Sequence, residues 1–87
     1  MIISGLYVET VPGKAEDAAK ELGKMKGVEI HHIEKNHKII LTIEADTVDQ
    51  SYKISDTFKQ IPSILLVCLV YNHFEEEPNY LEAVISQ

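Results

Sequence analysis

The pattern of apolar and polar positions along this chain predicts four strands and two helices. The longest apolar run, Ile64 to Tyr71, is eight residues long and lies between Pro62-Ser63 and the acidic residues 75–77. A membrane-spanning helix needs about 20 apolar residues, so this run is too short to cross a bilayer. Its β-branched and aromatic residues favour a strand, which we expect from Ile64 to His73 with apolar side chains on both faces.

Three further segments have the composition of strands. Residues Ile2 to Glu9 alternate with period two and are ended by Pro12-Gly13. Val28 to Glu34 and Lys38 to Glu44 form a predicted hairpin around the turn Lys35-Asn36. The register that gathers the most apolar residues on one face pairs Val28 with Ile43, Ile30 with Leu41 and His32 with Ile39, and it leaves Ile33 on the other face.

Two segments between the predicted strands have the period of amphipathic helices. Lys14 to Met25 presents an apolar stripe made largely of alanines, which allows close packing on a sheet. Thr47 to Ile61 begins with a capping box of Thr47 and Gln50 and ends before Pro62. The stripes consist of Ala15, Ala18, Ala19, Leu22 and Met25 in the first helix and of Val48, Ser51, Ile54, Phe58 and Ile61 in the second.

The order strand, helix, strand, strand, helix, strand predicts an α+β fold of the ferredoxin-like βαββαβ type. Right-handed crossovers place both helices on one face of a four-stranded antiparallel sheet, in the spatial strand order fourth, first, third, second. We expect residues 1–77 to form this one domain. Residues 78–87 are expected to be a C-terminal tail, in which Asn79 caps a short helix carrying Tyr80, Leu81, Val84 and Ile85.

Two helices cover only one face of such a sheet, so we expect the other face to be open. The residues predicted to face the core are Leu6, Val8, Val28, Ile30, Leu41, Ile43, Leu65, Val67 and Leu69. Those predicted on the open face are Ile3, Gly5, Tyr7, Ile40, Thr42, Leu66, Cys68 and Val70, with Glu9, Glu29, Glu44, His31 and Asn72 around them. The small residues at its centre predict a shallow apolar trough with an acidic rim. Such a patch usually marks a partner site, although a sheet-to-sheet homodimer or coverage by the tail would also bury it.

Composition and charge narrow the classes of partner. The 87 residues make one domain with a modest core and no deep catalytic cavity. The net charge is −6 and all eight basic residues are lysines, which disfavours nucleic acid and is compatible with a basic partner or with solubility alone. A single cysteine excludes an internal disulfide, and the N-terminus lacks the basic start of a signal peptide. We therefore expect a soluble cytoplasmic protein.

The residues present favour neither metal binding nor catalysis. The four histidines are His31, His32, His37 and His73. The second and fourth strands lie about 14 Å apart at three inter-strand spacings, so His73 cannot share a zinc ion with the others. Cys68 has no predicted histidine or arginine beside it to activate a nucleophile, and the loop after the first strand lacks the arginine of an acyl-phosphate hydrolase. Tyr7 lacks the aromatic neighbours of an RNA-stacking sheet. We expect no enzyme, no metal and no cofactor.

Four short motifs along the chain occur in an order and spacing typical of one family. They are Ile3-Ser4-Gly5-Leu6, Lys26-Gly27-Val28-Glu29-Ile30, Thr42-Ile43-Glu44-Ala45-Asp46 and Leu69-Val70-Tyr71 before an acidic run. Over roughly residues 2 to 77 the chain resembles the NapD family, the cytoplasmic assembly chaperones of periplasmic nitrate reductase. That family often has a histidine directly after the tyrosine, whereas this chain has Asn72 there and His73 one position later.

The resemblance implies a chaperone that binds the twin-arginine signal peptide of the catalytic subunit of periplasmic nitrate reductase. Such proteins hold the helical peptide on the sheet and keep the precursor from export while its molybdenum cofactor is inserted. The trough would accept the apolar side of the peptide, and Glu9, Glu44 or residues 75–77 would face its arginines. The peptide-binding residues implied are Ile3, Gly5, Tyr7, Glu9, Ile40, Thr42, Glu44, Leu66, Cys68, Val70 and Asn72. The resemblance implies a monomer that does not insert into membranes. The alternative function is a dimeric ferredoxin-like regulatory module that binds a small metabolite.

Overall fold

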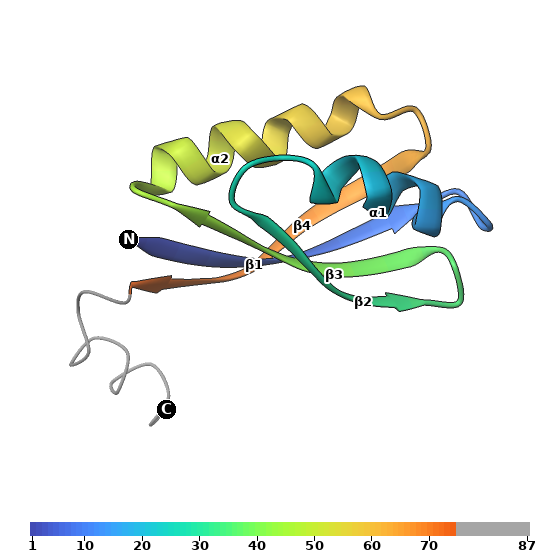
Figure 1. Ribbon diagram of the computed structural model, residues 1–87, viewed down its shortest axis with the longest axis horizontal. Coiled ribbons are helices and arrows are strands. Elements are labelled where there is room, and N and C mark those ends of the chain that lie inside the picture. Colours follow the sequence, from blue (N-terminus) through green and yellow to red (C-terminus); the bar gives the residue numbers. More distant parts are fainter. Residues whose placement is uncertain (75–87) are drawn as a thin grey trace.

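Four antiparallel strands and two helices make up the fold, as the computed structural model shows for residues 1–74. The elements are β1 (Ile2–Thr10), α1 (Ala15–Gly23), β2 (Val28–Glu34), β3 (Lys38–Ala45), α2 (Val48–Thr57), the 3-10 turn η1 (Phe58–Gln60) and β4 (Ile64–Phe74). The strands lie in the order β2-β3-β1-β4, and both helices lie on one side of the sheet (Figure 1). The predicted ferredoxin-like fold is confirmed. The predicted tail of residues 78–87, with its short helix, lies outside the described residues.

Polar contacts hold the start of each helix. The Thr47 hydroxyl accepts the backbone N–H of Gln50 at 3.1 Å, and the Gln50 side chain accepts the N–H of Asp46 at 3.0 Å, so the expected cap of α2 is present. The cap of α1 comes from farther along the chain. Asn36, in the turn between β2 and β3, accepts the N–H of Glu16 through its side chain at 2.8 Å. The hairpin turn therefore positions the start of α1.

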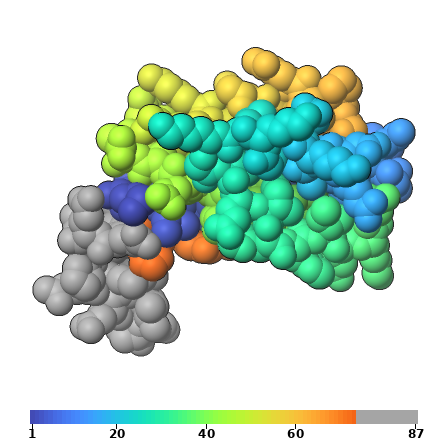
Figure 2. All heavy atoms as spheres, in the orientation of Figure 1, coloured from blue at the N-terminus to red at the C-terminus, as the bar shows by residue number. Residues whose placement is uncertain are grey.

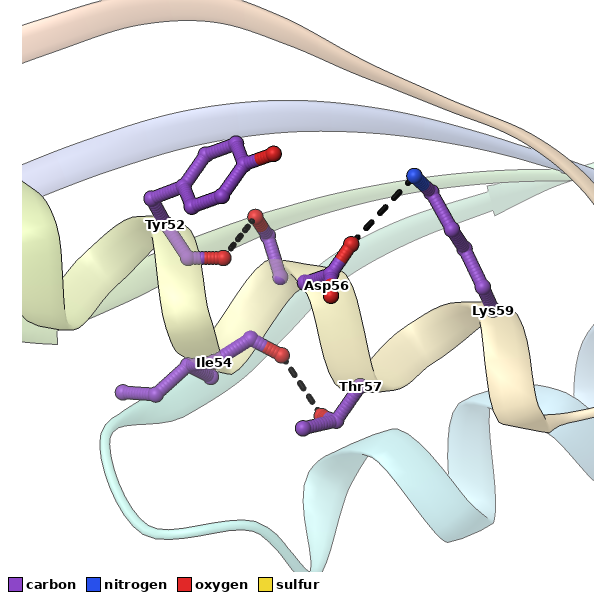
Figure 3. A network of polar contacts seen from close by, with 6 residues as sticks. Tyr52, Ile54, Asp56, Thr57 and Lys59 are labelled. Atoms are coloured by element: carbon purple, nitrogen blue, oxygen red, sulfur yellow. Dashed lines mark hydrogen bonds and ion pairs between the residues drawn. The ribbon is translucent and has the colours of Figure 1, made fainter.

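The polar contacts drawn in Figure 3 link residues that are close together in the sequence of α2 and η1. Two hydroxyls donate to carbonyl groups one turn back, and one exposed ion pair links residues three apart. These contacts are Ser55 to Tyr52 at 2.8 Å, Thr57 to Ile54 at 2.6 Å and Lys59 with Asp56 at 3.3 Å. An exposed pair of this kind adds little to stability, so α2 is held in place by its buried side.

The core lies between the helices and the sheet. Figure 2 shows α1 packed against the hairpin of β2 and β3, which the small alanine side chains of α1 allow. Burying this apolar surface is the main favourable term in folding. The buried apolar cluster consists of Leu6, Val8, Ala15, Ala18, Ala19, Leu22, Ile39, Leu41, Ile43 and Phe58.

A buried polar group joins α2, β1 and β4. Ser4 of β1 is almost fully buried, and its hydroxyl donates to the Asn72 side chain at 2.7 Å. The Ser51 hydroxyl of α2 lies 2.8 Å from the same Ser4 oxygen and completes its hydrogen bonding as the donor. Buried hydroxyls are costly without partners, so these bonds fix the end of β4 against β1 and α2.

The hairpin departs from the predicted register in its second half. A bulge between Ile30 and His32 shifts the pairing, so His32 lies opposite Ile40 and Ile33 lies opposite Ile39. The predicted pair of His32 with Ile39 is therefore wrong. Ile33, expected on the other face, packs against the core instead.

The cause of this shift lies in the turn. Lys35 and Asn36 both adopt left-handed backbone angles, with φ of 50° and 51°, and Glu34 pairs with Lys38 across them. The loop therefore holds three residues rather than the two expected. The extra turn residue changes the pairing by one, and the bulge in β2 restores the original pairing near its start.

Two bulges also interrupt the pairing of β4 with β1. They lie opposite the steps Gly5/Leu6 and Glu9/Thr10 of β1, and they leave Val70 and Leu65 of β4 without partners. Leu65 was expected in the core, but its side chain is 63% exposed, so that prediction is wrong. The bulge instead places Ile64 opposite buried Thr10, where Ile64 packs against the core.

Leu69 is on the predicted side of the sheet but is not buried. It lies opposite Leu6 of β1, yet its side chain is 55% exposed. The reason is that α2 packs mainly over β3 and β1, and only the short η1 packs over β4. Two helices thus cover three strands, and the helix-side surface of β4 stays accessible near Leu69.

Candidate functional site

The sheet face opposite the helices, called the open face below, carries most of the predicted site residues. Ser4, Leu6 and Val8 of β1 are buried toward the helices, so the alternate residues of β1 and their ladder partners project from the other side. The predicted residues found on the open face are Ile3, Gly5, Tyr7 and Glu9 of β1, Ile40, Thr42 and Glu44 of β3, and Leu66 and Cys68 of β4.

The centre of the open face is apolar and accessible. Tyr7 lies between Ile40 and Cys68, its partners on the two neighbouring strands. The side chain of Ile40 is 40% exposed and that of Leu66 is 48% exposed, while Cys68 is also exposed. Side chains of this kind gain free energy when a partner covers them, at about 25 cal/mol per Å² of apolar surface.

Gly5 was expected to form part of the bottom of a shallow trough, but it does not. The bulge at Val70 places Tyr71 opposite Gly5, and the Tyr71 ring lies directly on the glycine. A Cβ atom at Gly5 would overlap this ring, so the glycine is needed for the ring's position. The Tyr71 side chain remains 48% exposed. The middle of the open face is therefore a ridge formed by an aromatic ring.

The same bulge moves Asn72 away from the open face. Regular alternation predicted Asn72 on that face, but it lies opposite Ser4 and bonds to the Ser4 hydroxyl on the helix side. The predicted position of Asn72 is therefore wrong. His73 lies on the open face in its place, opposite Ile3. Val70, also predicted there, is the unpaired bulge residue, and its side chain is 64% exposed.

One end of the open face carries a tyrosine joined to a carboxylate. The Tyr7 hydroxyl donates to Glu9 Oε2 at 3.0 Å. Partial burial, this hydrogen bond and the negative charges of Glu9 and Glu34 raise the pKa of Tyr7 above its ordinary value of 10.0. Tyr7 is therefore a neutral hydrogen-bond donor at physiological pH. Lys38 lies opposite both Glu9 and Glu34 and offsets part of their charge.

The other end of the open face carries carboxylates without a lysine partner in the ladder. Glu44 lies opposite Ile3, and Glu29 lies opposite Thr42. Both glutamates are exposed. His31 Nε2 is 2.8 Å from the Thr42 hydroxyl, which holds the imidazole at this edge. In the ladder this end therefore carries two carboxylates and no lysine, whereas the Tyr7 end carries two carboxylates and Lys38.

Two hollows lie away from the centre of the open face. A groove of about 250 Å³ runs between α2 and β4, with Val67 and Leu69 on one side and Tyr52 on the other. A wider hollow of about 850 Å³ lies near the start of α2, against Met25 and Ile54. The groove at β4 is lined from the helix side of the sheet, whereas the wider hollow reaches the end of β3 and includes Glu44 at the edge of the open face.

The described residues, 1–74, present neither a cluster of metal ligands nor a membrane-spanning helix. No three of their His, Cys, Asp and Glu side chains come together in a way that could hold a metal ion. None of the helices in this part of the chain has the length and apolar character needed to cross a membrane. The Cys68 thiol contacts the Leu69 carbonyl at 3.7 Å.

Sequence reasoning missed three residues of the open face, namely Tyr71, His73 and His32. Each of them lies at or beyond a bulge, where the faces of the strand exchange. For β4 the local sequence carries no signal of this exchange, because every residue from Ile64 to Tyr71 is apolar.

Comparisons with known proteins agree with the fold. The family model described as NapD protein matches residues 1–76 of the 87. The solution structure of the E. coli Tat proofreading chaperone protein NapD superposes with a TM-score of 0.74 at 21% identity, over 86% of this chain and 80% of that one. The crystal structure of a hypothetical protein from Pyrococcus horikoshii gives a TM-score of 0.69 at 20% identity, over 85% of this chain and 90% of that one. Among curated proteins no match was found.

Proposed function

Since this chain belongs to the NapD family, we propose that it is a chaperone for a twin-arginine signal peptide. The peptide would be that of the catalytic subunit of a periplasmic nitrate reductase. The chaperone would hold this precursor in the cytoplasm while its molybdenum cofactor is inserted. A structure of the same fold is a Tat proofreading chaperone, which supports the proposal. The role needs no catalytic residue, no cofactor and no second copy of the chain.

The observation that carries the proposal is the open face itself. A signal peptide combines an apolar segment with a pair of arginines, and the open face combines an apolar centre with carboxylates at both ends. Ile40, Leu66 and Tyr71 all expose between 40% and 48% of their side chains. An amphipathic or apolar helix laid on this surface would bury them, as target helices bury the apolar surfaces of other helix-binding proteins.

The arginines are proposed to bind at the end that holds Glu29 and Glu44. These two carboxylates have no lysine opposite them, whereas Glu9 and Glu34 share Lys38. A guanidinium forms charge-assisted hydrogen bonds with carboxylates, and two free carboxylates suit two arginines better than a partly neutralised pair. The apolar segment would then run over Tyr71 toward Leu66 and Tyr7.

The test is calorimetric titration with a synthetic twin-arginine signal peptide. Leu66→Glu places a charge on the open face, where the peptide would have to desolvate it, at a cost of several kcal/mol. A loss of about 3 kcal/mol weakens binding more than a hundredfold. Val48→Glu is the matched control, since Val48 is 44% exposed but belongs to α2 on the opposite side of the sheet.

We expect Val48→Glu to bind the peptide as the wild type does and Leu66→Glu to lose binding while it stays folded. If both variants bind normally, the site does not lie on the open face. If the wild type fails to bind any twin-arginine peptide, the proposed function itself is wrong. The same samples, run on a sizing column, should elute as monomers.

Parallel Glu44→Gln and Glu9→Gln variants test the position of the arginines. Each replacement removes one charge and keeps the shape of the side chain. We expect Glu44→Gln to weaken binding more than Glu9→Gln. The opposite ranking would place the arginines at the Tyr7 end of the open face.

A further inference from the structure

The contact of Tyr71 with Gly5 gives the open face a fixed centre. The ring lies on the glycine in the space that a Cβ atom would fill. Along β1 the neighbouring open-face residues are Ile3 and Tyr7, and across the ladder Gly5 pairs with Thr42. The ring therefore lies over the central strand β1 although Tyr71 belongs to the edge strand β4. About half of the Tyr71 side chain still faces outward, at 48% exposure.

Several features hold this ring in one position. Asn72, the next residue, is bonded to the buried Ser4 hydroxyl at 2.7 Å, which ties down the backbone just after Tyr71. The unpaired Val70 before it lets the strand keep this register. A tyrosine side chain has few rotatable bonds, so it loses little conformational entropy when a partner binds.

We infer that Tyr71, seated on Gly5, is the central anchor of the peptide site and selects a helix with a small residue where it crosses the ring. This inference rests on the proposed function. The distance between packed helices depends on the size of the side chains at the contact, and we expect the same for a helix on this sheet. The Tyr71 ring rises above the backbone of β1, so a large peptide side chain directly over it would hold the helix off the sheet.

A small residue at the crossing point has the opposite effect. The ring then fits between the turns of the peptide helix, and flanking apolar side chains can descend onto Ile40 on one side and Leu66 on the other. Anchors of this kind, a rigid aromatic at the centre of an interface, carry a large share of binding free energy. The geometry thus assigns both a residue on the chaperone and a sequence requirement on the peptide.

The first experiment compares Tyr71→Ala, Tyr71→Phe and Tyr52→Ala by calorimetry with the synthetic twin-arginine signal peptide. Tyr52 is 66% exposed on α2 and serves as the control for loss of an exposed tyrosine. We expect Tyr71→Ala to weaken binding at least thirtyfold, the usual loss at an interface hot spot. Tyr71→Phe keeps the ring and should bind within a fewfold of the wild type, as should Tyr52→Ala. Thermal unfolding of each variant shows whether the domain stays folded.

The second experiment uses a double-mutant cycle to test the contact between Gly5 and the Tyr71 ring. Gly5→Ala places a methyl group where the ring lies and should displace the ring, so binding should fall although Tyr71 is intact. In the Tyr71→Ala background the same methyl group meets no ring, and Gly5→Ala should cause no further loss of binding. Equal losses in both backgrounds would mean that Gly5 acts independently of Tyr71, which would overturn the seating argument.

The third experiment tests the requirement on the peptide. Each small residue of its apolar segment is replaced in turn by leucine, and each peptide is titrated into the wild type and into Tyr71→Ala. We expect one position at which leucine weakens binding to the wild type but not to Tyr71→Ala. If leucine is tolerated at every position, Tyr71 does not select the helix.

The outcomes separate the inference from the function on which it rests. If the wild type binds the peptide and Tyr71→Ala binds it equally well, the inference is wrong and the proposed function stands. If the wild type does not bind, both fail. The Gly5 Hα resonance provides a check without peptide, because a ring stacked on Gly5 shields it. That shielding should be present in the wild type and in Tyr71→Phe, and its absence there would refute the contact.

Discussion

Neighbouring residues of β3 allow the two faces of the sheet to be compared with almost no change in chemistry. Leu41 is fully buried in the core, whereas Ile40 is 40% exposed on the open face. Leucine and isoleucine are isomers, so Leu41→Ala and Ile40→Ala remove the same atoms from adjacent positions of one strand. Any difference in their effects therefore reports the environment of each side chain.

The expected magnitudes follow from burial. Truncating a fully buried leucine costs about 2.7–5 kcal/mol, because the lost transfer energy adds to that of the cavity left behind. A domain of this size has a total stability of roughly 4–13 kcal/mol, so Leu41→Ala removes a large share. At about 4–8 °C per kcal/mol, a loss of 3 kcal/mol lowers Tm by roughly 12–24 °C. Ile40→Ala leaves no closed cavity and should cost about 1 kcal/mol.

Thermal unfolding followed by far-UV circular dichroism measures both losses, and peptide titration measures function. We expect Leu41→Ala to lower Tm strongly but to bind the peptide normally while it is folded. Ile40→Ala should keep nearly the wild-type Tm and lose affinity. Equal destabilisation by the two variants, or a larger loss of stability at Ile40, would refute the assignment of the faces.

Three further predictions address the cap, the acidic rim and the tyrosine at its end. Thr47→Ala removes the cap of α2 and should cost about 1 kcal/mol in chemical denaturation, while Thr47→Ser should cost little. Raising salt from ~50 to ~500 mM should weaken peptide binding without abolishing it, because exposed ion pairs are screened and apolar contacts are not; salt-independent affinity would exclude the acidic contacts. In an ultraviolet pH titration Tyr7 should ionise above the ordinary value of 10.0. The stability that its raised pKa contributes is complete below pH 10 and is lost as the pH rises through the folded pKa. Glu9→Gln should lower this pKa, since Glu9 supplies both the hydrogen bond and a charge.

The sequence alone predicted the helices and strands, their order along the chain, and the face of the sheet on which each residue of β1 and β3 lies. Most polar residues of β3, and Glu9 of β1, fall on one face, so a one-residue shift would carry charged side chains into the core, and the faces follow from the pattern. The cap at Thr47 could also be predicted, because it depends on residues three apart in the chain. The predicted positions of the open-face residues from Ile3 to Glu9 and from Ile40 to Glu44 are the ones found.

The faces on which the residues of β4 lie could not be predicted in the same way. Between Ile64 and Tyr71 every residue is apolar, so its sequence contains no alternation from which a bulge could be detected. The positions of Leu65 and Asn72 were predicted wrongly for this reason. The exposure of Leu69 has a different cause, since it depends on where α2 lies over the sheet, and no local pattern in the sequence records that position.

The unpaired residue in β4 has a consequence for how this protein can change over evolutionary time. Val70 has no partner in the β1 ladder, whereas Leu69 and Tyr71 on either side of it do. A descendant that lost the codon for Val70 would therefore keep Tyr71 opposite Gly5 and Asn72 opposite Ser4, with no bulge between Leu69 and Tyr71. A descendant that kept the strand length but straightened the bulge would exchange the residues on its two faces. Equivalent positions in such chains should be found by counting outward from Gly5, and a gap of one residue at Val70 would preserve the surface that a partner meets.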